Sequence, residues 1–90
     1  MKIIKLNKTF GNLIVTRNSV IDFFSSLADF STEDFVLDFE GIEFISRSGA
    51  HEYLNQKSIC GLNLREINLT SNVKAMFLLV AKQMKKAVSV

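Results

Sequence analysis

The stretch that decides the fold reads Asp38-Phe39-Glu40-Gly41-Ile42-Glu43-Phe44-Ile45-Ser46-Arg47-Ser48-Gly49-Ala50. It follows the apolar run Phe35-Val36-Leu37, which predicts a buried strand, and it leads into a helix that begins at Ser46 or Ser48. The hydroxyl of either serine can accept from the backbone N–H groups that a helix start leaves unpaired. Because such N–H groups favour anions, the loop can hold a phosphate, accept one, or present itself to a partner protein. The alternative is an ordinary helix cap.

The residues before this stretch predict two strands and a helix. Residues 2–6 and 12–16 alternate or run apolar, and Gly11-Asn12 predicts a tight connection between them, so we expect a hairpin. A helical pattern follows from Ser19, with Ser19 and Asp22 in capping-box positions. Its apolar positions are Val20, Phe23, Phe24, Leu27 and Ala28.

The middle of the chain continues the alternation of helices and strands. Residues Asp29 to Glu33 read as the polar exit of the first helix. Residues 34–39 are too short and too uniformly apolar for a solvent-exposed strand, so we expect them at the centre of the sheet, covered on both faces or nearly so. The second helix is predicted from about Ser48 to Lys57, with Ala50, Tyr53 and Leu54 facing inward. Cys60-Gly61 then turns the chain into a strand over residues 62–69.

The last helix has the most regular pattern. One apolar stripe contains Val73, Met76, Phe77, Val80, Ala81 and Met84. Leu78 and Leu79 widen the stripe beyond what contact with one sheet requires, which indicates either a partner surface or additional core. The order strand, strand, helix, strand, helix, strand, helix predicts one α/β domain over residues 1–90, a sandwich whose mixed, mostly parallel sheet has about four or five strands and about three helices.

Composition excludes several kinds of protein. A net charge of +2 is too small to indicate nucleic-acid binding. The single cysteine, Cys60, and the single histidine, His51, exclude an internal disulfide and a Cys/His metal cluster, and no glycine-rich cofactor fingerprint is present. No segment has the apolar length of a leader or a membrane span, so we expect a cytoplasmic protein with no metal and no cofactor.

The candidate catalytic residues do not form a recognisable set. Ser48, His51 and Asp38 supply the residue types of a hydrolase triad, but Ser48 and His51 lie on one helical turn and no Gly-x-Ser-x-Gly elbow surrounds either loop serine. We expect His51 at the surface and Glu52 as a first-turn carboxylate favoured by the helix dipole. An enzyme is therefore not expected.

Three segments carry a resemblance to a known family. They are 36–53, with Asp38-Phe39, Gly41-Ile42, Ile45-Ser46-Arg47-Ser48-Gly49-Ala50 and Glu52; 10–17, with Phe10-Gly11, Leu13 and Thr16-Arg17; and Asn72-Val73-Lys74 with the amphipathic helix behind it. On these residues nearly the whole chain resembles, in matching order, the STAS-like domain family of uncharacterised bacterial and archaeal proteins. That family is related to the STAS domains of anti-sigma factor antagonists.

The resemblance implies a regulatory protein–protein interaction module without catalytic machinery. In the antagonists, the partner is a serine kinase with a GHKL-type ATPase fold, and phosphorylation of a loop serine switches the complex off. Their loop reads apolar, Asp, Ser, Ser, Gly, with the first serine as acceptor; the corresponding residues here are Ile45, Ser46, Arg47, Ser48 and Gly49. Arg47 stands at the acceptor position and Ser46 replaces the family's Asp, so Ser46 and Ser48 are the remaining candidates for phosphorylation.

Arg47 is an unusual choice for the first turn of a helix. A cation there opposes the helix dipole by a few tenths of a kcal/mol to about 1 kcal/mol, and an anion on a partner would relieve that cost. We therefore expect Arg47 to engage a carboxylate or phosphate, with Asp38, Ser46, Ser48 and Gly49 in the same loop site; the alternative is an arginine that points into solvent. A small-anion or nucleotide sensor is the second reading of this site. A homodimer through the face from Met76 to Val80 is compatible with both.

Overall fold

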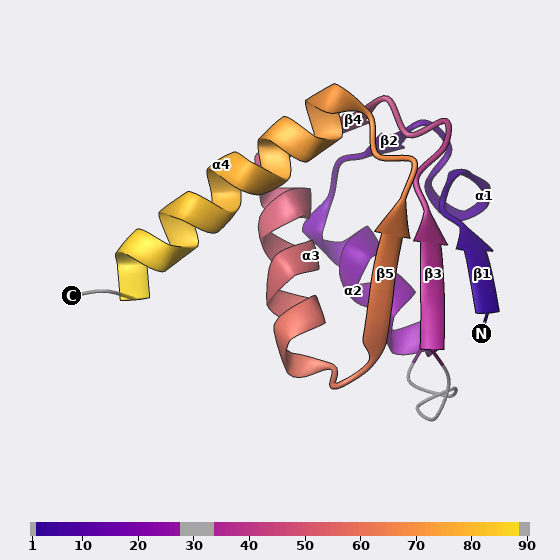
Figure 1. The fold of residues 1–90 in the computed structure, drawn as a ribbon, viewed down its shortest axis with the longest axis horizontal. Coiled ribbons are helices and arrows are strands. Elements are labelled where there is room, and N and C mark those ends of the chain that lie inside the picture. The colour runs from indigo at the N-terminus through magenta and orange to yellow at the C-terminus, as the bar shows by residue number, and fades with distance from the viewer. Residues whose placement is uncertain (1, 28–33, 89–90) are drawn as a thin grey trace.

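Strand β3 (Asp34–Asp38) lies at the centre of a three-stranded sheet, between β1 (Lys2–Lys5) and β5 (Asn63–Ile67). Both neighbours run parallel to it (Figure 1). The computed structural model describes residues 2–27 and 34–88, with the side chains of 86–88 excepted. Residues 35–38 are buried, as expected for a central strand, although the longer helices cover only one face of the sheet (Figure 1).

A second, two-stranded sheet pairs β2 (Leu13–Ile14) with β4 (Phe44–Ile45), also in parallel. The predicted N-terminal hairpin is therefore wrong, because β1 and β2 pair with different strands and the short helix α1 (Asn7–Phe10) occupies the connection between them. Pairing β1 with the buried β3 places Ile4 against the core, which an isolated hairpin could not do. The α/β class and the parallel pairing agree with the sequence prediction, and α1 is the helix that it missed.

Three longer helices complete the fold: α2 (Arg17–Leu27), α3 (Arg47–Ile59) and α4 (Ser71–Val88). Helix α2 begins two residues earlier than predicted, because Thr16 Oγ1 accepts from the Ser19 N–H at 3.2 Å and so caps the first turn. The predicted capping box of Ser19 and Asp22 is therefore wrong. Ala28 and the expected polar exit from Asp29 to Glu33 lie outside the described residues.

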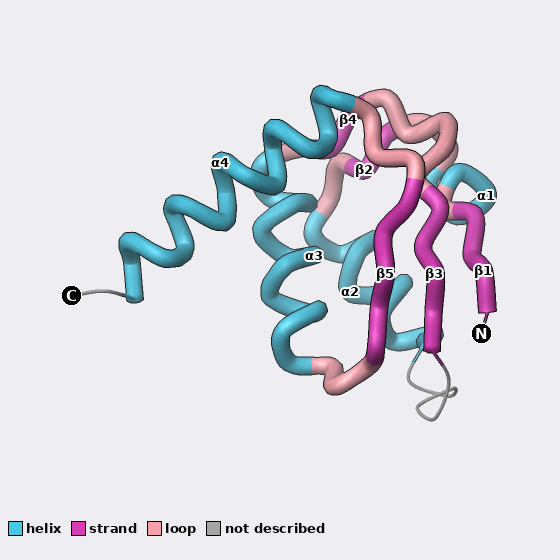
Figure 2. Tube along the Cα trace, viewed as in Figure 1, coloured by secondary structure: helices cyan, strands magenta, loops and turns pink. Residues whose placement is uncertain are grey.

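The helices lie on one side of the three-stranded sheet (Figures 1 and 2). Helix α3 packs between α2 and α4, and the first half of α4 lies against β4. In Figure 1 the second half of α4 extends beyond α3, away from the sheet. The core between helices and sheet contains Leu6, Ile14, Val20, Phe23, Phe24, Leu27, Phe35, Leu37, Phe39, Ile42, Ile45, Ala50, Tyr53, Leu64, Val73 and Val80.

Tyr53 of α3 is the centre of an aromatic cluster in this core. Its ring centroid lies 5.5 Å from that of Phe24, 5.9 Å from that of Phe39 and 5.0 Å from that of Phe77. Ring pairs at such separations add about 0.5–1.5 kcal/mol each beyond the area that they bury. The cluster ties α2, α3 and α4 together, so the start of α3 is held by a rigid scaffold.

The C-terminal half follows the sequence prediction closely. Ala50 and Tyr53 face inward, and Gly61 turns the chain into β5 with a φ of +71°, a backbone conformation that glycine adopts without strain. The stripe on α4 is confirmed at Val73 and Val80, which are fully buried, and at Met76, Phe77 and Met84, which are partly buried, but not at Ala81, which is exposed. Leu78 is 64% exposed and Leu79 is 42% exposed, so the alternative that both complete the core is wrong.

Candidate functional site

Two strand-to-helix junctions lie side by side in this fold. Strand β2 leads into α2 and β4 leads into α3, and the register of the two strands sets Ile14 beside Ile45. Just beyond the strands, the Ser46 N–H donates to the Ile14 carbonyl at 2.8 Å. Because the strands are parallel, both helices begin at the same edge of the small sheet, and both N-termini lie next to each other.

Ser46 holds the second junction together. Its Oγ accepts from the Gly49 N–H at 3.0 Å, as the cap of α3, and donates to the Val15 carbonyl at 2.5 Å. Gly49 is buried, and a Cβ on it would lie 3.2 Å from the Ile14 carbonyl oxygen and 3.1 Å from Ser46 Oγ. The close approach of β2 to α3 thus favours glycine at position 49, because a Cβ there would make two tight contacts. Ser46 and Gly49 are structural members of the predicted loop site, and the prediction that the helix begins at Ser46 or Ser48 is confirmed.

Each of the two helices begins with an arginine. The side chain of Arg47 is exposed and makes no hydrogen bond or ion pair with any other residue that the structure describes. Arg17 lies at the start of α2, and its Nε is 3.6 Å from Oε1 of Glu52. Glu52 is 7% exposed, and its other carboxylate oxygen accepts from Gln56 Nε2 at 2.8 Å. A nearly buried carboxylate therefore orients Arg17, whereas Arg47 has no described partner.

A shallow hollow of about 430 Å³ connects the two arginines with helix α4. Its lining residues are Arg17, Arg47, Ser48, His51, Val80 and Gln83. Arg47 and Arg17 supply positive charge, and the N–H groups of Arg47 and Ser48 have no partner among the described residues. Arginine forks and free N–H groups at helix starts are the groups that bind carboxylates and phosphates. The arrangement can therefore hold an anion.

The predicted loop residues are brought together, with one exception. Ser46, Arg47, Ser48 and Gly49 share the start of α3, but Asp38 belongs to a different contact. Its Oδ1 accepts from Asn68 Nδ2 at 3.0 Å and from the Glu40 N–H at 2.9 Å. These hydrogen bonds, that of Asn68 first, hold the pKa of the Asp38 carboxyl below its usual value of 3.8.

Asp38 therefore closes the turn after β3, and its inclusion in the loop site is wrong. Its nearly buried carboxylate is held between β3 and the residue that follows β5. The loop site and the Asp38 turn are separate structural features.

The histidine is exposed, as predicted, and it lies at the rim of the hollow. Ser48 Oγ has a contact of 3.4 Å with Ser46 Oγ, and no hydrogen bond joins Ser48 to His51 in the described part of the chain. The first-turn role predicted for Glu52 is wrong, because α3 begins at Arg47 and Glu52 lies in its second turn, facing Arg17. No group of three potential metal ligands gathers among the described residues.

Sequence reasoning missed Arg17, Glu52 and Gln83 as members of the site. The signal for Arg17 was a recurrence: Ile14-Val15-Thr16-Arg17 and Phe44-Ile45-Ser46-Arg47 are both two apolar residues, a hydroxyl residue and an arginine. It predicts two similar strand-to-helix junctions. Gln83 left no such signal, because its place depends on how α4 crosses α3.

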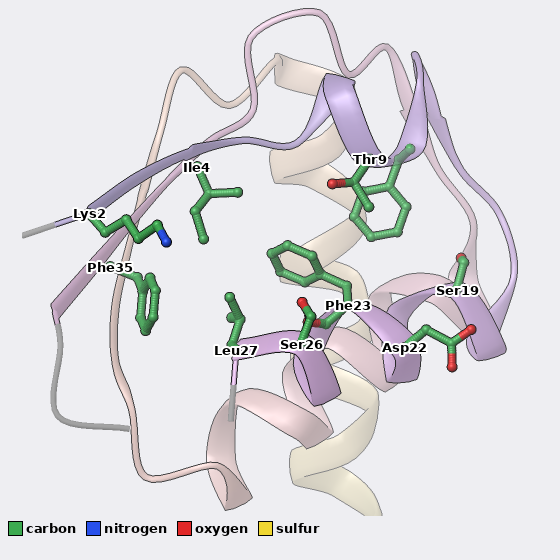
Figure 3. A pocket seen from close by; sticks show the side chains of 10 residues that line it. Lys2, Ile4, Thr9, Ser19, Asp22, Phe23, Ser26, Leu27 and Phe35 are labelled. Atoms are coloured by element: carbon green, nitrogen blue, oxygen red, sulfur yellow. The ribbon is translucent and has the colours of Figure 1, made fainter. Parts of the chain in front are cut away.

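A larger hollow lies elsewhere, between β1, α1 and α2, with a volume of about 580 Å³ (Figure 3). Its floor contains the core side chains Phe23, Leu27 and Phe35. The hydroxyls of Ser19 and Ser26 at its rim donate to carbonyls of their own chain segment, those of Thr16 and Phe23. The hollow therefore marks the open edge of the sheet beside β1, and Lys2, Thr9 and Asp22 add polar groups to its lining.

The comparisons with known proteins add no relative: no family model, no curated protein and no solved structure matches this chain. Among the described residues, no helix has the length and apolar character needed to cross a membrane.

Proposed function

We propose that the protein is a non-catalytic regulatory module that docks on a protein partner through residues 45–50. The observation that carries the proposal is the side chain of Arg47, which is exposed, begins α3 and has no partner among the described residues. A cation at this position opposes the helix dipole. Glu52 already pairs with Arg17, so an acidic group of a partner at Arg47 would remove the remaining cost.

The resemblance of the chain to the STAS-like domain family suggests which kind of protein the partner is. We expect a GHKL-type ATPase that acts as a serine kinase, or a similar anti-sigma-like regulator, and we expect the two proteins to meet in the cytoplasm. The module itself would supply binding energy and no chemistry.

Phosphorylation would act at Ser48 and not at Ser46. The hydroxyl of Ser46 is used twice, toward Gly49 and Val15, so a phosphate there would break the cap of α3. Ser48 is exposed, its hydroxyl has one weak contact, and Arg47 precedes it. A phosphate on Ser48 would gain the helix N-terminus and a guanidinium as partners, and it would compete with the acidic group of the partner for them.

Affinity capture from a lysate would identify a partner protein, and titration calorimetry with that partner tests the proposal. We expect Arg47→Glu to weaken binding by more than about 1 kcal/mol, because it replaces an attraction with a repulsion. Arg65→Glu is the matched control, since Arg65 is exposed on β5 and does not line the hollow. Equal affinities for the wild type and Arg47→Glu would refute docking through Arg47.

A small-anion or nucleotide sensor is the second candidate function, and the hollow between the two arginines favours it. A ligand at a hundred times its Kd stabilises a protein by about 2.7 kcal/mol, which a thermal melt detects readily. Stabilisation by phosphate, ATP or a guanine nucleotide that Arg47→Glu abolishes would indicate the sensor. The docking module predicts no such stabilisation at millimolar ligand.

A further inference from the structure

Three large apolar side chains lie half-exposed on the outward face of the small β2–β4 sheet. Leu13 is 45% exposed, Val15 is 47% exposed and Phe44 is 45% exposed. The alternate residues of the same strands, Ile14 and Ile45, are buried in the core. Since side chains alternate across a strand, Leu13, Val15 and Phe44 share the opposite face.

These three side chains form one patch, which we call the β2–β4 patch. Leu13 and Phe44 are register partners, so their side chains are direct neighbours, and Val15 follows Leu13 on the same face. Of the other exposed large apolar residues in the described chain, Ile3 lies on β1 and Ile59 at the end of α3, while Leu78 and Leu79 are adjacent on α4 and line a separate hollow. Contiguous apolar side chains on a surface mark interaction sites, whereas scattered ones are ordinary.

The charges around the patch are ordered along its strands. Glu43 precedes Phe44 and accepts from Asn12 Nδ2 at 2.7 Å, so the start of the patch is acidic. Arg47 begins the helix that follows β4 and has no described partner, so the end of the patch is basic, whereas the charge of Arg17 at the start of α2 is offset by Glu52. A partner that covers the patch must therefore be apolar in its middle and acidic at the end that meets Arg47.

We infer that the β2–β4 patch and Arg47 form one docking surface for a protein segment that carries a large apolar residue beside an aspartate or glutamate. The inference rests on the proposed function and names the chemistry of the partner. A free anion would leave the patch uncovered. A lipid surface would need a broader apolar area than three half-exposed side chains on a two-stranded sheet.

Selection of a random peptide library on the whole 90-residue protein tests this inference without a known partner. We expect enriched peptides to carry an aromatic or aliphatic residue within a few positions of an acidic one. Their affinities are then measured by fluorescence anisotropy. Phe44→Ser should weaken binding roughly tenfold or more, as expected for a buried anchor at an interface.

Ile59→Ser is the matched control, because Ile59 is 67% exposed and lies at the far end of α3, about 18 Å along the helix from Arg47. It should leave the affinities unchanged. Leu13→Ser serves as a second patch variant, and the thermal melt of each variant shows whether it folds. A folded Phe44→Ser or Leu13→Ser protein that binds like the wild type overturns the inference.

The outcomes separate the inference from the proposed function. Peptides that lose affinity with Arg47→Glu but not with Phe44→Ser would overturn the apolar part of the surface and leave docking through Arg47 in place. Peptides that respond to neither substitution, or a selection that enriches no peptide, would count against both. Dependence on both residues supports a single continuous surface.

Discussion

Replacing Ser46 with alanine should destabilise the protein more than any other single hydroxyl deletion in the loop. The substitution removes two hydrogen bonds of the Ser46 hydroxyl. One is accepted from the Gly49 N–H and caps α3, and the other is donated to the Val15 carbonyl and connects α3 to the end of β2. Loss of a serine cap costs about 1 kcal/mol. The second hydrogen bond, to the Val15 carbonyl, contributes about another 1 kcal/mol. The expected loss is therefore about 2 kcal/mol.

Urea unfolding followed by far-ultraviolet circular dichroism measures this loss. In a domain of this size, about 2 kcal/mol corresponds to a fall in Tm of roughly 8–16 °C. Ser48→Ala is the matched control, since Ser48 is exposed and its hydroxyl has only the 3.4 Å contact with Ser46. It should change the free energy of unfolding by less than about 0.5 kcal/mol.

Two results would refute the reasoning. Unfolding of Ser46→Ala at the same urea concentration as the wild type would mean that the Ser46 hydroxyl does not fix the junction. Equal losses for Ser46→Ala and Ser48→Ala would mean that the two hydroxyls share the cap, and the assignment of Ser48 as the accessible phosphorylation site would then fail.

Two further perturbations test other parts of the structure. The pKa of the Asp38 carboxyl is lower in the folded protein than in the unfolded chain, so the ionised carboxylate stabilises the fold. This stabilisation is complete above the unfolded pKa of about 3.8 and is lost as the pH falls through the lower folded pKa. Urea titrations between about pH 6 and pH 2 should therefore show a smaller acid loss for Asp38→Asn than for the wild type, and identical slopes would contradict this. Leu78 and Leu79 are exposed, so a homodimer through them would give twice the monomer mass in light scattering. Replacing both leucines with serine should return the mass to that of the monomer. A dimer that persists in this double variant would use another face.

The sequence is sufficient for the parts of the fold that depend on local periodicity. The stripe that contains Val73 and Val80 predicts α4, and the uniformly apolar run from Phe35 to Leu37 predicts the central strand. The cap of α3 is also predictable, because Ser46 stands between an apolar pair and a helical pattern. In each case the signal lies within a few residues of the element that it predicts.

Features that depend on pairing distant segments could not be predicted in this way. The short apolar runs around Ile4 and Ile14 resemble the two strands of a hairpin. In the structure β1 instead pairs in parallel with the buried strand β3, more than thirty positions away. The same kind of pairing, between β2 and β4, brings Arg17 beside Glu52. Asp38 was assigned to the loop site because it is close in sequence, yet its hydrogen bond reaches Asn68.

The most direct test of docking through Arg47 is a parallel affinity capture with tagged wild type, Arg47→Glu and Arg65→Glu. Each tagged protein is incubated with a lysate of the organism that the protein comes from. Quantitative mass spectrometry compares what the three proteins retain. The account predicts that the wild type and Arg65→Glu retain a GHKL-type ATPase or a related regulator and that Arg47→Glu loses it. Recovery of the same proteins in the same amounts by all three would contradict the account.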